Sequence, residues 1–320
     1  MSRPIIAVTD SPFPTLDPAM AALKRLDPEV RMAKSASADD ILAVARDADA
    51  ILVTYAKLTG DLLRQLQRCK AIGRFGLGVD NIDLVAAKEK GIAVNYVPDY
   101  CIHEVSDHAM ALLLSLIRKI PLSNTVVQAG RWEMPVVVPI RRNTGTVLGL
   151  IGFGNIPRLV APKAQAFGIT VQAYDPFAKP EAFTAANVAS VDFDTLLRTS
   201  DYLSVHAPSL PETRGMLNEE AFLKMKKGAY IVNTARGPLI DEAALVAALD
   251  SGQVGGAALD VVTTEPLAKD SALLGRANVI ITPHTGFYSV EALAELQTKC
   301  ASDVARVLSG EPAVYPISAK

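Results

Sequence analysis

Residues 147–175 read VLGLIGFGNIPRLVAPKAQAFGITVQAYD, and this stretch decides the fold. An apolar run enters a glycine turn, a helical segment follows, and a second apolar run ends on an acid, Asp175. This is the order of a dinucleotide-binding βαβ unit, in which one glycine permits the turn and another lets the backbone approach a pyrophosphate. The new helix presents unpaired N–H groups and its positive dipole end to the phosphates. The sequence therefore predicts that the phosphates lie against Gly152, Phe153, Gly154, Asn155 and Ile156.

Asp175 predicts which dinucleotide is bound. It lies 23 positions after Gly152, close to where a ribose-binding acid is expected. Its carboxylate would accept a hydrogen bond from a 2′-hydroxyl and repel a 2′-phosphate, so we expect NAD rather than NADP. The motif departs from the usual pattern at Pro157, where a third glycine normally allows close packing of helix on strand. Proline is nevertheless tolerated in the first turn of a helix. The alternative interpretation of the whole motif is an ordinary glycine turn in an α/β sheet.

Composition limits the class of protein. The chain has 320 residues, enough for about two domains, and it is 50% hydrophobic with a net charge of −2. It has no lysine and arginine block, so no nucleic-acid partner is expected. The apolar segment 109–117 ends at Arg118, far short of a membrane span, and no signal-peptide pattern opens the sequence. We therefore expect no membrane partner. The widely spaced Cys69, Cys101 and Cys300 indicate reduced thiols and a cytoplasmic location.

The segment from His103 to His108 reads HEVSDH and invites a metal-site interpretation. Five positions, at about 100° per residue, place the two imidazoles on different faces of a helix, so they would not share one zinc ion. Glu104 and His108 are four apart, share a face and would be able to pair. We expect no metal.

Strand and helix patterns alternate along the whole chain. In the first half, strand runs at 5–8, 51–55, 71–75 and 92–97 alternate with helical stretches at 20–26, 39–48, 60–68 and 82–90. In the second half, strands at 147–151, 169–174, 202–205, 230–233, 256–259 and 279–282 alternate with helices that include 195–198, 219–225 and 242–249. Such alternation predicts an α/β protein with two doubly wound parallel-sheet domains and an interdomain cleft for a small substrate. Residues 120–146 are expected to form an irregular arm, and a last helix, 289–308, exceeds what the second sheet needs.

Three later strand ends carry reactive side chains: Arg236 in VNTARGPLIDE, Glu265 in ALDVVTTEP and His284 in ITPHTG. Ligands of open α/β sheets bind at the carboxyl ends of strands, so we expect these three residues to converge. Histidine suits proton donation to a ketone oxygen near neutral pH, and a neighbouring carboxylate favours the imidazolium form. Arginine offers a planar fork to a substrate carboxylate. Each residue alone would be an ordinary polar group, but the set indicates hydride transfer to a 2-oxo acid.

These motifs resemble the D-isomer-specific 2-hydroxyacid dehydrogenase family over nearly the full length of the chain. Residues 152–175 resemble its NAD segment, 201–218 its adenosine-side segment, and 233–242, 259–266 and 282–286 its arginine, glutamate and histidine motifs. Residues 75–83, FGLGVDNID, are similar to the family's substrate-carboxylate loop. Residues 98–101, 104–109 and 287–289 are most similar to the C-terminal-binding-protein-like branch.

The resemblance implies a domain plan. A flavodoxin-like substrate domain is expected at 1–98 and 288–320, and a Rossmann NAD domain at 99–287 with a dimerisation arm around 100–146. A homodimer is expected.

The resemblance also implies roles for residues. Arg236 would hold the substrate carboxylate, while His284 acts as acid and base with Glu265. The implied substrate contacts are Tyr55, Leu77, Gly78, Arg236 and His284. Beyond the glycine turn, the implied cofactor contacts are Asp175, His206, Ala207, Pro208, Thr213, Thr234, Ala235, Arg236, Asp260, His284 and Gly286.

The sequence leaves three functions open. The leading hypothesis is an NAD-dependent oxidoreductase that interconverts a small 2-oxo acid and its (R)-2-hydroxy acid. The second is an NAD(H)-sensing, corepressor-like scaffold without significant turnover. The third, formate or phosphite oxidation, is disfavoured because formate enzymes typically pair the histidine with glutamine, whereas this chain has Glu265. The sequence does not identify the substrate, because a second cation site at Arg74, Lys57, Arg141 or Arg142 is indistinguishable from surface charge.

Overall fold

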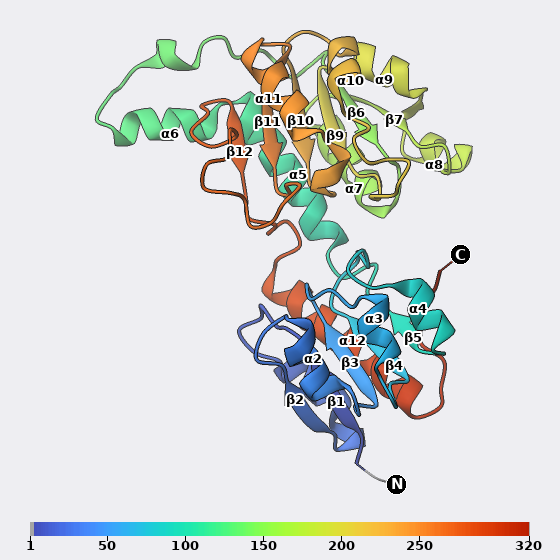
Figure 1. The fold of residues 1–320 in the computed structure, drawn as a ribbon. Coiled ribbons are helices and arrows are strands. Elements are labelled where there is room, and N and C mark those ends of the chain that lie inside the picture. Colours follow the sequence, from blue (N-terminus) through green and yellow to red (C-terminus); the bar gives the residue numbers. More distant parts are fainter. Residues whose placement is uncertain (1–2, 320) are drawn as a thin grey trace. The chain divides into compact units, whose positions relative to one another are not determined.

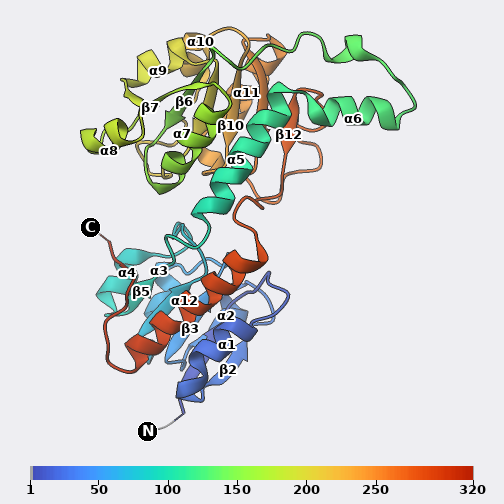
Figure 2. The same ribbon diagram turned by 180° about the vertical axis from the view of Figure 1, so that it is seen from behind.

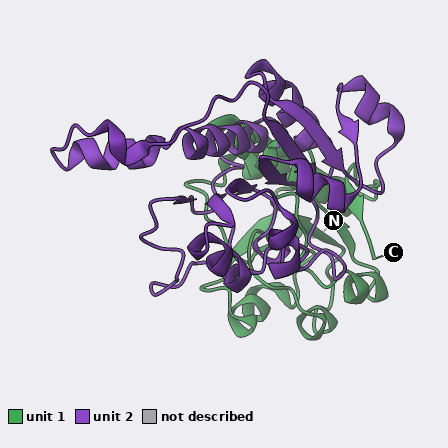
Figure 3. Ribbon diagram, turned by 90° about the horizontal axis from the view of Figure 1, so that it is seen from above, with its two compact units in different colours: residues 1–101, 289–320 green, residues 102–288 purple. Residues whose placement is uncertain are grey.

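A computed structural model describes residues 3–319 of the chain. The chain divides into two compact units (Figure 3): unit 1 comprises Met1–Cys101 and Ser289–Lys320, and unit 2 comprises Ile102–Tyr288. Unit 2 is therefore inserted in the sequence between the two segments of unit 1, and each unit has its own sheet.

The sheet of unit 1 has the order β13-β5-β4-β3-β1-β2 (Figure 1). Strands β1 to β5 are parallel, and the short β13 joins β5 in the antiparallel sense. The order β2-β1-β3-β4-β5 is that of flavodoxin-like folds. The strands are β1 (Ile5–Val8), β2 (Glu29–Met32), β3 (Ala50–Val53), β4 (Ala71–Arg74), β5 (Ala93–Asn95) and β13 (Pro316–Ile317).

Helices cover both faces of this sheet, as Figures 1 and 2 show from opposite sides. Helices α2 (Ala38–Ala45), α3 (Gly60–Arg64) and α4 (Leu84–Glu89) pack on one face. Helices α1 (Asp17–Leu23) and α12 (Val290–Leu308) pack against each other on the opposite face. Gly73 of β4 allows α12 to approach closely, since a Cβ there would lie 2.7 Å from Val304 and 2.8 Å from Cys300.

The sheet of unit 2 is entirely parallel, with the order β12-β11-β10-β9-β6-β7-β8. It contains the Rossmann order, whose direction reverses between β6 and β9; dinucleotides bind at such a reversal. The strands are β6 (Val147–Ile151), β7 (Thr170–Tyr174), β8 (Ala189–Ser190), β9 (Tyr202–Val205), β10 (Ala229–Asn233), β11 (Val254–Leu259) and β12 (Val279–Ile281).

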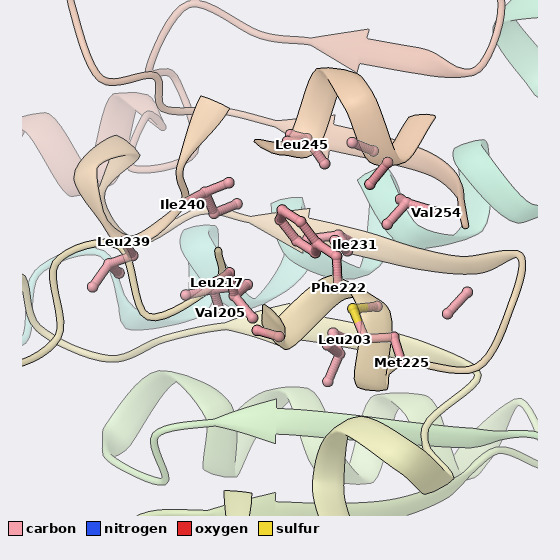
Figure 4. Packing of buried hydrophobic residues seen from close by; sticks show 14 of the residues in the cluster. Leu203, Val205, Leu217, Phe222, Met225, Ile231, Leu239, Ile240, Leu245 and Val254 are labelled. Carbon is pink, nitrogen blue, oxygen red and sulfur yellow. The ribbon is translucent and has the colours of Figure 1, made fainter. Parts of the chain in front are cut away.

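Two hydrophobic clusters hold the helices of unit 2 to its sheet. One contains side chains of α5 (Ile102–Ile117), α7 (Asn155–Ala166) and α8 (Pro180–Ala185). The other, shown in Figure 4, lies on the opposite face under α9 (Phe193–Thr199), α10 (Glu219–Lys224) and α11 (Glu242–Asp250). There, fully buried Leu203 and Ile231 of the strands pack with Phe222 and Leu245 of the helices. The sheet is thus buried on both faces, as parallel sheets require.

The predicted fold class is confirmed, and the differences are local. The strands β2, β8 and β13, which lie at sheet edges, were not predicted from the sequence. In β2, Val30 and Met32 are exposed, so no apolar run indicates this strand. The prediction of an irregular arm at 120–146 is wrong at its start. Residues Ile120–Gln128 form α6, because proline at 121 falls in the first turn where it is tolerated, and Met134–Val137 form a 3₁₀ turn.

The arm expected around 100–146 therefore begins later than the sequence suggested, because α5 packs into the core of unit 2. No single helix in residues 3–319 is long and apolar enough to cross a membrane; α5 and α6, bent by 60°, pass that test only as a pair.

Candidate active site

The predicted cofactor and catalytic residues of unit 2 share one edge of its sheet. They follow the carboxyl ends of six parallel strands, which lie at the same edge because the strands run in one direction. The glycine turn follows β6, Asp175 follows β7, and the segment from His206 to Thr213 follows β9. Thr234, Ala235 and Arg236 follow β10, Asp260 and Glu265 follow β11, and His284 and Gly286 follow β12.

The glycine turn has the geometry that a pyrophosphate needs. Gly152 has φ +90°, and a Cβ there would lie 3.0 Å from the backbone of His206 and Ala207, so a side chain is excluded. A Cβ on Gly154 would meet no atom within 4 Å, which leaves open space beside the backbone. Helix α7 begins directly afterwards at Asn155 and runs for 12 residues. The predicted phosphate-binding residues are thus placed at the start of a long helix, and Pro157 is buried within it.

Asp175 is held against this turn. Its Oδ2 accepts a hydrogen bond from the N–H of Phe153 at 2.7 Å, and its Oδ1 accepts from the N–H of Phe177 at 2.9 Å. The carboxylate is therefore held beside the glycine turn, where it would be able to accept a hydrogen bond from the ribose next to the pyrophosphate. In the same edge, the Thr234 hydroxyl is buried without a hydrogen-bond partner in residues 3–319, as expected of a group that meets a ligand. These residues fit a dinucleotide.

His206 occupies the strand end beside the glycine turn. Its Nε2 lies 2.8 Å from the Ser204 hydroxyl. Burial lowers the pKa of His206 to about 3, so the ring is neutral near pH 7. A ring that stays neutral suits a place in the cofactor's surroundings and does not suit acid–base chemistry. Further along this loop, the Thr213 hydroxyl donates to the carbonyl of Pro208 at 2.7 Å.

His284 and Glu265 form a hydrogen-bonded pair. Nδ1 of His284 lies 2.8 Å from Oε2 of Glu265, and the two side chains are 29% and 38% exposed. Partial burial alone would raise the pKa of Glu265, but the hydrogen bond and charge of His284, the N–H of Val262 and the charge of Arg236 together hold it below its usual value. Glu265 is therefore ionised near neutral pH, and its carboxylate fixes the orientation of the His284 ring through Nδ1.

Arg236 is positioned by the end of β10. The buried Asn233 donates from its side-chain amide to the carbonyl of Arg236 at 2.9 Å and accepts from the N–H of Ala235 at 3.0 Å. A Cβ on Gly237 would lie 2.0 Å from the carbonyl carbon of Val262, so the loops after β10 and β11 are in direct contact. This packing brings Arg236 close enough for its charge to act on Glu265.

Asp260 ties the histidine loop to the end of β11. It is 3% exposed, and its carboxylate accepts hydrogen bonds from the Thr282 hydroxyl at 2.6 Å and from the N–H groups of Thr285 and Gly286 at 2.9 Å each. Burial would raise its pKa, but these donors, together with His108, lower it to about 2. The carboxylate is already occupied by hydrogen bonds from this chain.

His108 also belongs to this site, although the sequence analysis did not place it there. The sequence raised a pairing with Glu104 on the same helix. In the structure, Nε2 of His108 lies 3.0 Å from the Thr282 hydroxyl and 3.3 Å from Oδ1 of Asp260. Thr282 is 174 positions away in sequence, so no local pattern would have indicated this contact.

The predicted substrate residues of unit 1 also follow strand ends. Tyr55 comes after β3, and Leu77 and Gly78 come after β4. Asp10, after β1, accepts from the N–H groups of Thr54 at 3.1 Å and Tyr55 at 2.6 Å, which fixes the backbone at the end of β3. The side chains of Tyr55 and Leu77 are 49% and 38% exposed, so both are accessible within unit 1.

Comparison with known proteins agrees with this geometry. The family model described as D-isomer specific 2-hydroxyacid dehydrogenase, NAD binding domain, matches residues 110–286, more than half of the chain. This chain belongs to the D-isomer-specific 2-hydroxyacid dehydrogenase family. Its matched segment is an NAD-binding domain, in agreement with the Rossmann domain and the NAD cofactor that the sequence predicted. The assignment to the C-terminal-binding-protein-like branch stays a prediction.

Curated relatives and solved structures extend the match beyond the NAD domain. The D-3-phosphoglycerate dehydrogenase of Mycobacterium tuberculosis is 38% identical over 97% of this chain, which covers 58% of that protein. The chain thus spans little more than half of such relatives. The TT0316 protein of Thermus thermophilus has a TM-score of 0.89 at 30% identity, with 98% and 99% of the two chains covered. The D-lactate dehydrogenase of Aquifex aeolicus, solved with NAD and lactic acid, has a TM-score of 0.85 at 30% identity, with 96% of each covered.

Proposed function

We propose that this chain interconverts a small 2-oxo acid and its (R)-2-hydroxy acid with NAD as the hydride carrier. The observation that carries the proposal is the His284–Glu265 hydrogen bond of 2.8 Å, formed next to Arg236 on the same sheet edge as the glycine turn. An acid–base pair, a cation and a dinucleotide turn are the parts that ketone reduction requires.

The reduced cofactor supplies a hydride, and the glycine turn, Asp175 and Thr234 are the residues that would hold it. In the direction of reduction, the substrate's carbonyl carbon gains that hydride while its oxygen gains a proton. His284 donates the proton, since it is the residue of the group that readily carries one near neutral pH. Glu265 balances the positive charge of the imidazolium and fixes the ring through Nδ1, which leaves Nε2 as the donating atom.

Arg236 would bind the substrate carboxylate in two-pronged fashion and orient the ketone. The side-chain amide of Asn233 bonds to the carbonyl of Arg236, and the adjacent Gly237 packs against Val262. The backbone that carries the guanidinium is therefore held in place. Tyr55, Leu77 and Gly78 of unit 1 would complete the substrate contacts through exposed side chains and backbone N–H groups. The names of relatives support a 2-hydroxy acid: they include D-3-phosphoglycerate and D-lactate dehydrogenases and a glyoxylate reductase.

The proposal is tested by NADH oxidation with glyoxylate, hydroxypyruvate, pyruvate, phenylpyruvate and 3-phosphohydroxypyruvate, each repeated with NADPH. We expect turnover with at least one acid and a preference for NADH. His284→Ala should lower kcat by about 10²- to 10⁴-fold, the usual contribution of a general acid, while calorimetry shows unchanged NADH binding. The exposed His103→Ala serves as the control and should keep full activity. Wild-type protein that binds NADH but reduces none of these acids would favour the NAD(H)-sensing scaffold instead.

We also propose that the chain forms a homodimer through its arm and acts in the cytoplasm. The support for the dimer is the exposure of Trp132, Met134 and Val138, which are 91%, 70% and 56% accessible. Sedimentation of wild type and a Trp132→Ser, Met134→Ser variant tests it: the variant should shift toward monomer, whereas an unchanged mass would exclude the arm as the interface. The support for the location is the three free cysteines.

A further inference from the structure

His108 lies in the second turn of α5, the long helix that begins unit 2. The apolar side of α5 is buried in the core through residues that include Ala109, Leu112, Leu113 and Leu116. The helix is therefore fixed to the sheet independently of the loops at the sheet edge. The ring of His108 is therefore carried by a rigid element and is able to hold a neighbouring loop in place.

A chain of hydrogen bonds runs from this ring to Asp260. The Thr282 hydroxyl has one proton, which it donates to Oδ1 of Asp260 at 2.6 Å. The same hydroxyl therefore accepts at its contact with His108, and Nε2 of His108, 3.0 Å away, must carry the donated proton. Hydrogen bonds are therefore donated from His108 to Thr282 and from Thr282 to Asp260. Nε2 of His108 also lies 3.3 Å from Oδ1 of Asp260.

Asp260 in turn holds the loop that carries His284. Its carboxylate accepts from the N–H groups of Thr285 and Gly286, and its own carbonyl accepts from the N–H of His284 at 2.8 Å. His284 has φ +53°, a left-handed conformation that is uncommon for a residue with a side chain. Such a conformation persists only where its surroundings impose it.

Contact between the loop and these groups is tight. A Cβ on Gly286 would lie 2.9 Å from Oδ2 of Asp260 and 3.2 Å from the ring of His108. The loop backbone at Gly286 thus lies close to both Asp260 and His108, with no room for a side chain between them.

We propose that His108 is a positioning residue, which acts through Thr282 and Asp260 to hold the 282–286 loop and so to aim the ring of His284. The inference rests on the proposed function for its kinetic part only. His108 itself is assigned no contact with substrate. Without the N–H of His108, Asp260 keeps only the hydrogen-bond donors of the 282–286 loop, so the hydrogen-bonded connection between this loop and α5 is lost.

The experiment compares His108→Leu, which removes the donor, with His108→Gln, which keeps an N–H at the end of a side chain of similar reach. His103→Leu, an exposed position on the same helix, is the matched control. We expect His108→Leu to lower kcat by about 10- to 100-fold, as loss of an orienting partner does, with the KM of the 2-oxo acid and the NADH Kd within about twofold. Amide hydrogen exchange at His284, Thr285 and Gly286, whose N–H groups bond to Asp260, should speed up in His108→Leu only, and His108→Gln should recover both readouts.

Two results would overturn the inference. One is unchanged exchange at residues 284–286 in His108→Leu. The other is a uniform loss of kcat, substrate affinity and NADH affinity that His108→Gln does not rescue, since this would mark a residue needed only for folding. Hydrogen exchange is measured without turnover. If the wild-type protein reduced no substrate, the proposed function would be refuted, and the exchange rates would still show whether His108 holds the loop.

Discussion

The glycine turns of the two units look alike in sequence, but only the turn of unit 2 leads directly into a helix. Gly76 comes after β4 in unit 1, and Gly152 and Gly154 come after β6 in unit 2; both strands lie inside parallel sheets. After Gly154, the 12-residue helix α7 starts at once. After Gly76, the next helix is the six-residue α4, which starts only at Leu84 and is capped by Asp83. The turn of unit 2 therefore adds the unpaired N–H groups and positive dipole end of a long helix to its glycines, which favours phosphate binding, and the turn of unit 1 does not.

The acids at the strand ends show the same contrast. Asp10 of unit 1 and Asp175 of unit 2 each follow a strand and accept N–H groups from the end of the neighbouring strand. Asp175 receives its hydrogen bond from within the glycine turn itself, whereas Asp10 supports the backbone of Thr54 and Tyr55. Similar local geometry thus holds the proposed cofactor turn in unit 2 and the end of β3 in unit 1.

The largest expected effect separates the two turns. Gly154→Ala fills the open space beside the phosphate-binding backbone, so we expect the NADH Kd to rise about 100-fold, which corresponds to the loss of one or two charge-assisted hydrogen bonds. The melting temperature should change by no more than about 4 °C. Calorimetric titration and a melting curve measure the two quantities.

Gly76→Ala should give the opposite result. Gly76 has φ +149°, and a Cβ there would fall 1.2 Å from the Arg74 guanidinium, so the variant is strained and must displace that side chain. We expect lower stability and a higher KM for the 2-oxo acid with unchanged NADH affinity. Equal losses of NADH binding in the two variants would show that the turns are not functionally distinct.

A smaller effect is expected from substitution of the two strand-end acids, Asp175 and Asp10. Asp175→Ser removes the carboxylate that opposes a 2′-phosphate, so the ratio of kcat/KM for NADPH to that for NADH should rise about tenfold or more, equivalent to about 1.4 kcal/mol. Asp10→Ser is the matched control and should leave the ratio unchanged, although it loosens the backbone at Tyr55. If Asp10→Ser shifted the ratio as strongly, Asp175 would lose its assigned role.

The smallest effect is on pH-dependent stability. Because the folded-state pKa of Asp260, about 2, lies below its ordinary value of 3.8, the ionised carboxylate stabilises unit 2 fully above about pH 4, and this stabilisation is lost as the pH falls toward 2. We expect Asp260→Asn to melt a few degrees below wild type at pH 7, by roughly 2–4 °C per kcal/mol lost. Differential scanning calorimetry should show the gap closing between pH 4 and pH 2. Asp61→Asn, at an exposed site of unit 1, is the control for the loss of one carboxylate.

The buried parts of both sheets were predictable because a strand covered on two faces is a continuous apolar run. Strand β1 and the pair β6 and β7 carry this signal, whereas β2 faces solvent at Met32 and carries none. The approach of Glu265 to His284 was also predictable, because parallel strands end at one edge. The role of His108 was not: its partners come from β11 and β12, and only the folded sheet brings a residue of α5 against them.

Helix α12 has a consequence for how the polypeptide is made. Its Cys300 and Val304 cover Gly73 on one face of the first sheet, yet they are synthesised more than 220 residues after β4 ends at Arg74. The inserted segment from 102 to 288 is continuous in sequence, and its two hydrophobic clusters are formed by its own residues. Unit 2 can therefore fold during translation. Unit 1, whose first segment is translated before unit 2, is therefore completed after it, and one face of its sheet stays uncovered in the nascent chain until α12 is synthesised.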